Sequence, residues 1–409
     1  MKHRVVQYID YYGDKMGGGA IFAKWLNIYF NYVKKIPALI LSTSYPNKYS
    51  RYNEDLESIL LVGKNVKPFV KHFVSSPRGK RKTAKAFAWF GTNIYLIMKK
   101  YDILQIHGSI SSTKLPFINR LYFCPICIAL HLRNTYKKYI KKVVLTLHAY
   151  WTLVNLVNNT NNIKDIALAE KMLFDNVDDI IAVELYHYNV LREQNMSARI
   201  HYIPSASVPK KLVYNPYVIP NIEIDEEILN KIRNKIKICL PSRLEPERNI
   251  IDFVRQYIKA INTYDYVRRN TILLIAGSGS LENLIRHISE KISNIIYLGA
   301  LSHIEVLSMI RDHCDIVVNT AKSPGTGRIT IEAFTFKKPV LRRMSIDINP
   351  IVDGVNGIVY SDDDIIDKLV DISLMRYDLH KLGEHGQETV KKRFLFEDIA
   401  EKYMNIYNL

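Results

Sequence analysis

The stretch KIKICLPSRLEPERN, residues 235–249, decides the fold class of this chain of 409 residues. It opens with a short aliphatic run at 236–240 and continues into a polar loop that precedes an amphipathic, helix-length segment at 252–261. A β-branched run, a loop and a helix together make the repeating unit of a parallel α/β sheet. We therefore predict that a sheet of this kind begins near residue 235.

The same alternation runs through the rest of the chain. Helices are predicted at 165–174, 252–261, 281–292 and 304–311, and strands at 38–42, 103–107, 143–148, 180–183, 200–203, 236–240, 271–276, 295–298, 316–319 and 339–341. Ten strands are too many for one ordinary open sheet, so we predict two Rossmann-like domains with parallel sheets. Residues 205–225 carry prolines without periodicity and are predicted to connect the domains irregularly, and residues 396–409 form an amphipathic helix.

Positive charge is concentrated in the first part of the chain. The whole chain has 57 Lys and Arg against 40 Asp and Glu, a net charge of +17. Residues 1–164 hold 26 basic and 6 acidic side chains, whereas residues 201–409 hold 28 and 27. We therefore expect the N-terminal domain to meet an anionic partner or an anionic membrane surface, with nucleic acid as the less favoured partner.

Cysteine content and hydropathy limit the cellular compartments in which the protein is expected. Four cysteines do not make a disulfide framework, and no window reaches the ~18 apolar residues of a membrane span. We expect a cytoplasmic protein, and a peripheral position on the cytoplasmic membrane face stays open. Cys124 and Cys127, with His131 nearby, lack a second ligand pair, so no metal is expected. Cys239 and Cys314 are predicted to be small core residues.

Four loops carry groups that suit an anionic ligand. The first follows an expected opening strand and the others follow the strands named above, and loops at strand ends are where open α/β sheets bind ligands. They hold Gly17 to Gly19, then Arg243 with Arg248, then the glycines 277 and 279, and then PGTGRITIEAF at 324–334 with Glu332. Glycine turns at helix starts and paired guanidiniums suit phosphate, and a carboxylate suits sugar hydroxyls. Plainer interpretations stay open: a flexible connection, arginines paired with nearby glutamates, a tight turn and a solvated glutamate.

Taken in order, these segments resemble the C-terminal domain of the family 4 retaining glycosyltransferases (glycosyl transferases group 1). The matching segments are SRLEPERN at 242–249, GSG at 277–279, LGAL at 298–301, PGTGRITIEA at 324–333 and VDGVNG at 352–357. In the N-terminal half, the glycines 17–19 and TLH at 146–148 are similar to the family pattern, as is the closing helix at 396–407. The ordered set is far more specific than any one motif.

The resemblance implies the α/β architecture called GT-B. Two Rossmann-like domains with parallel sheets face one another across a cleft, and a C-terminal helix crosses back to the N-terminal domain. The expected divisions are an acceptor domain at 1–205, a linker at 206–234, a nucleotide-sugar domain at 235–390 and the returning helix at 391–409.

The resemblance also implies roles for single residues. Arg243 and Arg248 would hold the donor diphosphate and stabilise the departing nucleotide, and His148 would contact the donor sugar. Glu332 would bind the ribose hydroxyls, and Leu301 would line the base pocket. The other donor contacts would come from Gly18, Gly19, Gly277, Gly325, Thr326, Gly327, Ile329 and Thr330.

The implied activity is retaining transfer of a hexosyl group from a UDP- or GDP-sugar to an acceptor hydroxyl, without cofactor or metal. The acceptor would be a glycan, a glycolipid or another anionic or membrane-associated molecule. Pro324 stands where the family has its first glutamate, and IPSASV at 203–208 lacks the Asn, Gly and Asp of the family's hinge motif. Two alternatives therefore stay open: a glycosyltransferase that modifies nucleic acid, and a catalytically degenerate GT-B module that binds a nucleotide-sugar.

Overall fold

The chain divides into two compact units, residues 1–205 with 398–409 and residues 206–397. The computed structural model describes residues 4–9, 18–42, 61, 67, 70–72, 101–107, 140–148, 167, 170, 171, 173–322 and 325–409. Because the first unit contains both the N-terminal and the C-terminal residues, the chain passes from one unit to the other twice.

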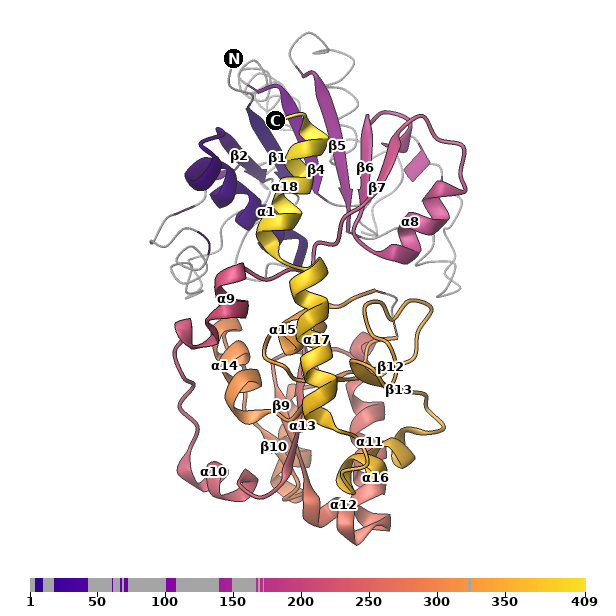
Figure 1. Ribbon diagram of the computed structural model, residues 1–409. Coiled ribbons are helices and arrows are strands. Elements are labelled where there is room, and N and C mark those ends of the chain that lie inside the picture. Colours follow the sequence, from indigo (N-terminus) through magenta and orange to yellow (C-terminus); the bar gives the residue numbers. More distant parts are fainter. Residues whose placement is uncertain are drawn as a thin grey trace, which may run out of the picture. The chain divides into compact units, whose positions relative to one another are not determined.

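A parallel sheet of seven described strands forms the first unit, in the order β3-β2-β1-β4-β5-β6-β7 (Figure 1). The strands are β1 (Val5–Ile9), β2 (Ala38–Ser42), β3 (Val70–His72), β4 (Ile103–His107), β5 (Lys142–Leu147), β6 (Asp179–Ala182) and β7 (Arg199–Tyr202). The described helices are α1 (Gly18–Ile28), the π-helix η1 (Tyr29–Lys34), α8 (Leu185–Arg192) and α18 (Phe396–Tyr407).

A second parallel sheet, in the order β10-β9-β8-β11-β12-β13, forms the other unit. Its strands are β8 (Ile236–Pro241), β9 (Thr271–Ala276), β10 (Ile295–Tyr297), β11 (Ile316–Asn319), β12 (Val340–Arg343) and β13 (Gly357–Tyr360). Its helices are α9 (Lys210–Tyr214), η2 (Pro216–Val218), α10 (Glu226–Ile232), η3 (Pro246–Arg248), α11 (Ile250–Thr263), α12 (Asp265–Asn270), α13 (Glu282–Lys291), α14 (His303–His313), α15 (Arg328–Thr335), α16 (Ile365–Ser373) and α17 (Leu379–Arg393).

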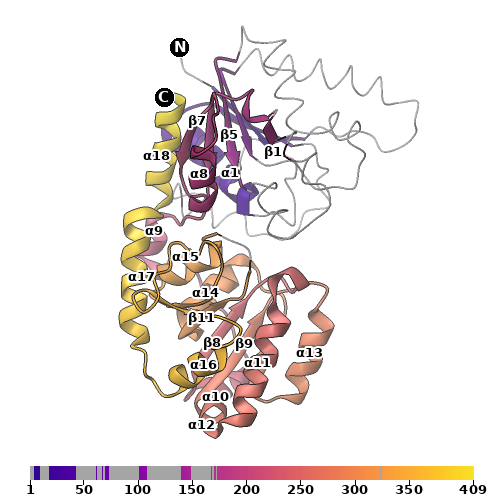
Figure 2. The same cartoon turned by 90° about the vertical axis from the view of Figure 1, so that its right-hand side faces the viewer.

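The central strands are buried along their whole length. Every residue of β5 and β9 is buried, and both strands are rich in β-branched and aliphatic side chains. Figure 2 shows why in the second unit: α11 and α13 cover one face of the sheet, and α14 and α15 cover the other. The two Rossmann-like parallel sheets predicted from the sequence are therefore confirmed.

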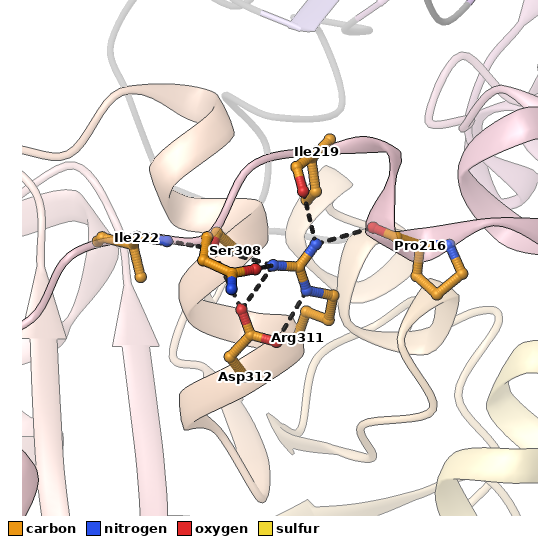
Figure 3. A network of polar contacts seen from close by, with 7 residues as sticks. Pro216, Ile219, Ile222, Ser308, Arg311 and Asp312 are labelled. Carbon is orange, nitrogen blue, oxygen red and sulfur yellow. Dashed lines mark hydrogen bonds and ion pairs between the residues drawn. The ribbon is translucent and has the colours of Figure 1, made fainter.

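Residues 206–234, predicted as an irregular linker, contain α9, η2 and α10 and belong to the second unit. Figure 3 shows how Arg311 of α14 fastens this segment. Its Nη1 donates to the carbonyl oxygens of Pro216 (2.9 Å) and Ile219 (2.8 Å), and its Nη2 donates to Asn221 Oδ1 (2.5 Å). Asp312 balances the charge of this buried guanidinium. Pro209 and Pro216 stand at the starts of two short helices, α9 and η2, where proline is tolerated. The prolines therefore do not exclude helices in this segment, contrary to the irregular connection that the sequence pattern suggested.

The two cysteines predicted as small core residues are joined to one another. Cys239 of β8 and Cys314, just before β11, form a disulfide between residues 75 apart in sequence. Both residues are buried, as predicted, and the bond between them was not predicted. Their bonding depends on β8 and β11 being neighbours, although two strands lie between them in sequence.

Asp179, at the start of β6, is the buried centre of an ionic cluster in the first unit. Its carboxylate accepts from His201 Nε2 (2.7 Å) and Arg199 Nη2 (2.9 Å), and Lys142 Nζ lies 3.2 Å away. Lys142 Nζ also donates to the carbonyl oxygen of Ile406, so the cluster ties β5 and β6 to α18. Burial alone would raise the pKa of Asp179, but these donors lower it to about 2.

None of the helices in the described part of the chain has the length and apolar character needed to span a bilayer.

We predict that Arg311→Met destabilises the protein by about 3 kcal/mol, because the buried Ile219 carbonyl, the partly buried Pro216 carbonyl and the Asp312 carboxylate lose their guanidinium donor. Urea denaturation measures the loss. The control is Arg376→Met, which removes an exposed ion pair with Asp371 and is expected to change stability by less than about 1 kcal/mol. Equal effects from both variants would show that Arg311 does not fasten residues 216–222.

Asp179 gives a pH-dependent prediction. The pKa of Asp179 in the folded protein, about 2, lies below the ordinary value of 3.8. Its contribution to the free energy of unfolding is therefore complete above pH 4 and is lost as the pH falls to 2. Asp179→Asn should therefore cost about 2 kcal/mol or more at pH 7, and the difference from wild type should shrink as the pH falls through that window. Denaturant titration at several pH values checks this, with the exposed Asp175→Asn as the control. A difference that does not depend on pH would contradict the assignment.

Candidate functional site

The predicted donor-site residues of the second unit follow the carboxyl ends of adjacent strands. The loop at 242–249 follows β8, the turn at 277–281 follows β9, residues 298–302 follow β10, and residues 320–327 follow β11. Because the strands are parallel, all four loops leave the same edge of the sheet, which is where open α/β sheets bind ligands.

The loop after β8 lies directly on the turn after β9. Leu244 N donates to Ser278 O (2.9 Å), and Glu245 accepts from the backbone and hydroxyl of Ser280. At Gly277, where φ is +139°, a Cβ would lie 1.8 Å from the carbonyl oxygen of Ser242. Glycine is therefore required at 277 for the loop that carries Arg243 to approach so closely.

Arg243 and Arg248 place two cations on this loop. The Arg243 side chain is 65% exposed and lies 3.7 Å from Glu247, so it is available to a ligand. Arg248 is partly buried: burial lowers its pKa, the neighbouring Arg243 lowers it further, and Glu247 opposes them. The Arg248 carbonyl accepts from the Thr320 hydroxyl at the end of β11, which holds the loop beside the next candidate segment.

Glu332 is buried on α15, 4% exposed, and is not the solvated surface glutamate of the plainer interpretation. Its Oε1 accepts from His303 Nε2 (2.7 Å) and from Arg328 Nε (2.8 Å). Burial would raise the pKa of Glu332, but His303 and Arg328 lower it, so the carboxylate is ionised at neutral pH. Both contacts end on Oε1, so neither of them occupies Oε2.

The start of α15 is built around Asn319. Thr330 Oγ1 accepts from Asn319 Nδ2 (3.4 Å), and a Cβ at Gly327, where φ is +65°, would lie 2.8 Å from the same nitrogen. Gly325 N donates to Asp347 O (3.0 Å), and Thr326 is buried. Ile329 is partly buried in the first turn of the helix. This helix start follows Thr320, which contacts the loop that carries Arg243 and Arg248, and it favours an anion.

Leu301 is partly buried and directly precedes Ser302, which caps α14 together with Glu305. The next residue is His303, the partner of Glu332. The contacts thus bring together the loops after β8, β9 and β11, and α14 with α15. Pro324, the departure from the family pattern, lies outside the described residues.

The remaining predicted residues lie in the first unit. Gly18 and Gly19 begin α1, which follows β1. His148 directly follows β5 and is partly exposed, and burial lowers its pKa to about 4. Cys124, Cys127 and His131 lie outside the described residues. In the part of the chain that is described, no group of three His, Cys, Asp or Glu side chains is arranged to hold a metal ion.

Two groups of residues at these sites belong to no motif of the family. The first is His303, for which the only signal in the sequence is the pattern S-x-x-E at 302–305, which marks a helix start at the carboxyl edge of the sheet. The second consists of polar residues inside strands of the first unit, Gln7, Gln105 and His107. They are buried and contact one another and His148.

Comparison with known proteins gives matches of two kinds. A family model for "Glycosyl transferases group 1" matches residues 235–374. Two proteins of Methanocaldococcus jannaschii that are named as uncharacterized glycosyltransferases match by sequence. MJ1069 is 23% identical over 246 residues, covering 58% of this chain and 60% of that protein. MJ1178 is 31% identical over 140 residues, covering 32% of this chain and 39% of that protein.

The structural matches extend over nearly the whole chain. Sucrose-phosphate synthase from Thermosynechococcus elongatus has a TM-score of 0.70 at 14% identity, covering 99% of this chain and 98% of that one. Anabaena Alr3699/HepE, solved in complex with UDP, has a TM-score of 0.67 at 14% identity, covering 99% of both chains. Residues 235–374 therefore match the model of the glycosyl transferases group 1 family, and the whole chain has the fold of the GT-B glycosyltransferases.

Proposed function

We propose that this chain is a retaining hexosyltransferase that moves a sugar from a UDP- or GDP-sugar to an acceptor hydroxyl. The donor would occupy the carboxyl edge of the second sheet. Arg243 and Arg248 would bind the diphosphate, Glu332 the ribose hydroxyls, and Leu301 the base. His148 of the first unit would contact the sugar.

The observation that carries the proposal is the chemistry gathered at this one edge. Two guanidiniums on the loop after β8 and a helix start after β11 suit an anion, and a buried, ionised carboxylate stands beside them. A nucleoside diphosphate carries both complementary parts, an anionic diphosphate and a vicinal diol. HepE, which shares the fold, has been solved with UDP and with UDP-glucose.

We further propose that transfer needs no bound metal. The negative charge on a departing nucleoside diphosphate must be stabilised, and fixed cations do this in place of a metal. Arg243 and Arg248 supply two such cations on one loop. Activity that is unchanged by a chelator would support this part of the proposal, and activity restored only by a divalent cation would overturn it.

For the acceptor we propose an anionic or membrane-associated glycan or glycolipid at the cytoplasmic membrane face. The support is the net charge of the first 164 residues, which hold 26 basic and 6 acidic side chains. The densest basic cluster, at 77–82, lies outside the described residues. Binding to anionic vesicles in preference to DNA would favour this acceptor class over nucleic acid.

Pro324 favours one alternative, a GT-B module that binds a nucleotide-sugar without turning it over. The family's first glutamate is absent at this position. A panel of nucleotide-sugars tested for thermal shift and for hydrolysis separates the two functions. Stabilisation without any turnover would favour the binding module, and turnover of one donor would favour the transferase.

We predict that Arg243→Ala weakens binding of UDP or GDP, whichever stabilises the wild type, by about 10- to 100-fold. The reason is the loss of one or two charge-assisted hydrogen bonds to the diphosphate. Isothermal titration calorimetry measures the affinity. The control is Arg255→Ala on α11, where an exposed arginine 3.9 Å from Asp252 is removed from the same unit. Unchanged affinity in Arg243→Ala would refute the assignment of the diphosphate to this loop.

Gly277→Ala tests the loop without touching a charge. Its Cβ would meet the Ser242 carbonyl at 1.8 Å, so residues 242–244 must move, and we expect nucleotide affinity to fall at least about tenfold. Gly354→Ala is a matched control because Gly354 also has a positive φ, +71°, a Cβ there meets nothing within 4 Å, and the residue lies outside the four candidate loops. The control measures backbone strain alone, about 1 kcal/mol of stability. Equal affinities in the two variants would mean that the position of the loop does not matter for binding.

A further inference from the structure

A line of buried polar side chains crosses the first sheet and ends at His148. Gln105 Oε1 on β4 accepts from the Tyr407 hydroxyl of α18 and from Gln7 Nε2 on β1 (3.3 Å). Gln7 Nε2 also lies 3.5 Å from His107 Nε2, and His107 Nδ1 lies 3.3 Å from His148 Nε2. Gln7, Gln105 and His107 are each at most 2% exposed, so this line is closed to solvent until it reaches His148.

The direction of these hydrogen bonds follows from one unpaired atom. An amide side chain can be turned over to exchange its oxygen and nitrogen, so the line could in principle run either way. In the orientation above, the only buried atom of the line without a partner is Gln7 Oε1. If every group were reversed, the unpaired atom would be the Gln7 nitrogen, with two N–H groups. Buried N–H groups without partners are rarer and costlier than an unpaired carbonyl, so the first direction is favoured.

That direction fixes the protons on both histidines. Gln7 donates to His107 Nε2, so the His107 proton must lie on Nδ1, from which it is donated to His148 Nε2. His148 Nε2 is then an acceptor. We propose that Gln105, Gln7 and His107 are positioning residues that hold His148 as the neutral imidazole with its proton on Nδ1.

The directions of the pKa shifts agree with neutral imidazoles at both His107 and His148. Burial lowers the pKa of His107 well below its ordinary value, and the adjacent His148 lowers it further. Burial lowers the pKa of His148 to about 4. The planes of the two rings differ by 20° and their centroids lie 5.6 Å apart, so two positive charges there would repel. In the described part of the chain, Nδ1 of His148 has no hydrogen-bond partner.

This inference bears on the proposed function and rests on it only for the identity of the ligand. A histidine whose Nε2 is already an acceptor and whose Nδ1 carries the proton offers a ligand one N–H donor. It is not a general base. His148 would therefore donate a hydrogen bond to an oxygen of the sugar or phosphate and would not remove a proton from the acceptor hydroxyl.

The test is long-range ¹H–¹⁵N NMR on the full chain labelled with ¹⁵N-histidine, because the coupling pattern identifies the protonated ring nitrogen. The chain has 12 histidines, and His148→Asn identifies the signal that belongs to position 148. At pH 7 we expect one neutral form with the proton on Nδ1. A proton on Nε2, a mixture of the two forms or a charged ring would each overturn the proposal.

Two variants test the line itself. Gln7→Met keeps the length of the side chain but removes the donor to His107, and should leave His148 as a mixture of tautomers. Thr146 Oγ1 accepts from Gln105 Nε2 (3.0 Å) and donates to the Tyr403 hydroxyl (3.4 Å), and it lies outside the line to His148. Tyr403→Phe is therefore the control and should leave the His148 signal unchanged. An unchanged His148 signal in folded Gln7→Met would overturn the proposal that this line of side chains sets the tautomer of His148. If Gln7→Met does not fold, the wild-type spectrum still decides.

The NMR result and the proposed function can fail separately. The tautomer is read without any nucleotide, so it stands or falls whether or not a sugar is transferred. In a transferase, Gln7→Met should lower turnover by about tenfold while UDP affinity is unchanged, because the diphosphate contacts lie in the second unit. Loss of UDP affinity in that variant would show a structural defect and would count against a positioning role.

Discussion

The candidate site depends on the parallel pairing of β8 with β9 on one side and β11 on the other. The chain leaves β8 toward β9 and leaves β11 toward β12, so α11 and α15 pack on opposite faces of the sheet. The loops that precede these helices therefore diverge from neighbouring strand ends, as at the switch point of other open α/β sheets. This topology places Arg248 beside Thr320, 72 residues later in sequence, and brings the arginine loop next to the start of α15.

Two buried carboxylates show how the same electrostatics serve different ends. Asp179 and Glu332 would each be protonated more readily by burial, and in each case nearby cationic groups keep the carboxylate ionised. The partners of Asp179 engage both of its oxygens, which suits a group that ties strands to a helix. The two partners of Glu332 both engage Oε1. A carboxylate held ionised through one oxygen is suited to accept hydrogen bonds from a ligand through the other.

Local pattern predicted most of the sheet strands, because buried parallel strands are continuous aliphatic runs. Residues 38–42, 103–107 and 271–276 match β2, β4 and β9 residue for residue. Short elements with weak or proline-rich patterns, such as α9 and the three-residue β3, carried too little signal. Motif order indicated Arg243, Arg248 and Glu332. It could not indicate that His303 contacts Glu332 or that Cys239 bonds Cys314, because both contacts depend on strand order across 29 and 75 residues.

The polar residues inside the first sheet show what a purely aliphatic interior would lack. Gln7 and Gln105 lie opposite one another in the register of β1 and β4, where Val or Ile would pack without any need for partners. Two buried amides cost stability unless their groups are hydrogen-bonded, and here the bonds run from Tyr407 to His107. The buried amides also provide something that aliphatic side chains cannot, which is a direction of hydrogen bonding. An amide has a donor end and an acceptor end, so a row of amides gives the neighbouring imidazoles a direction, and with it a defined position for the proton on His148.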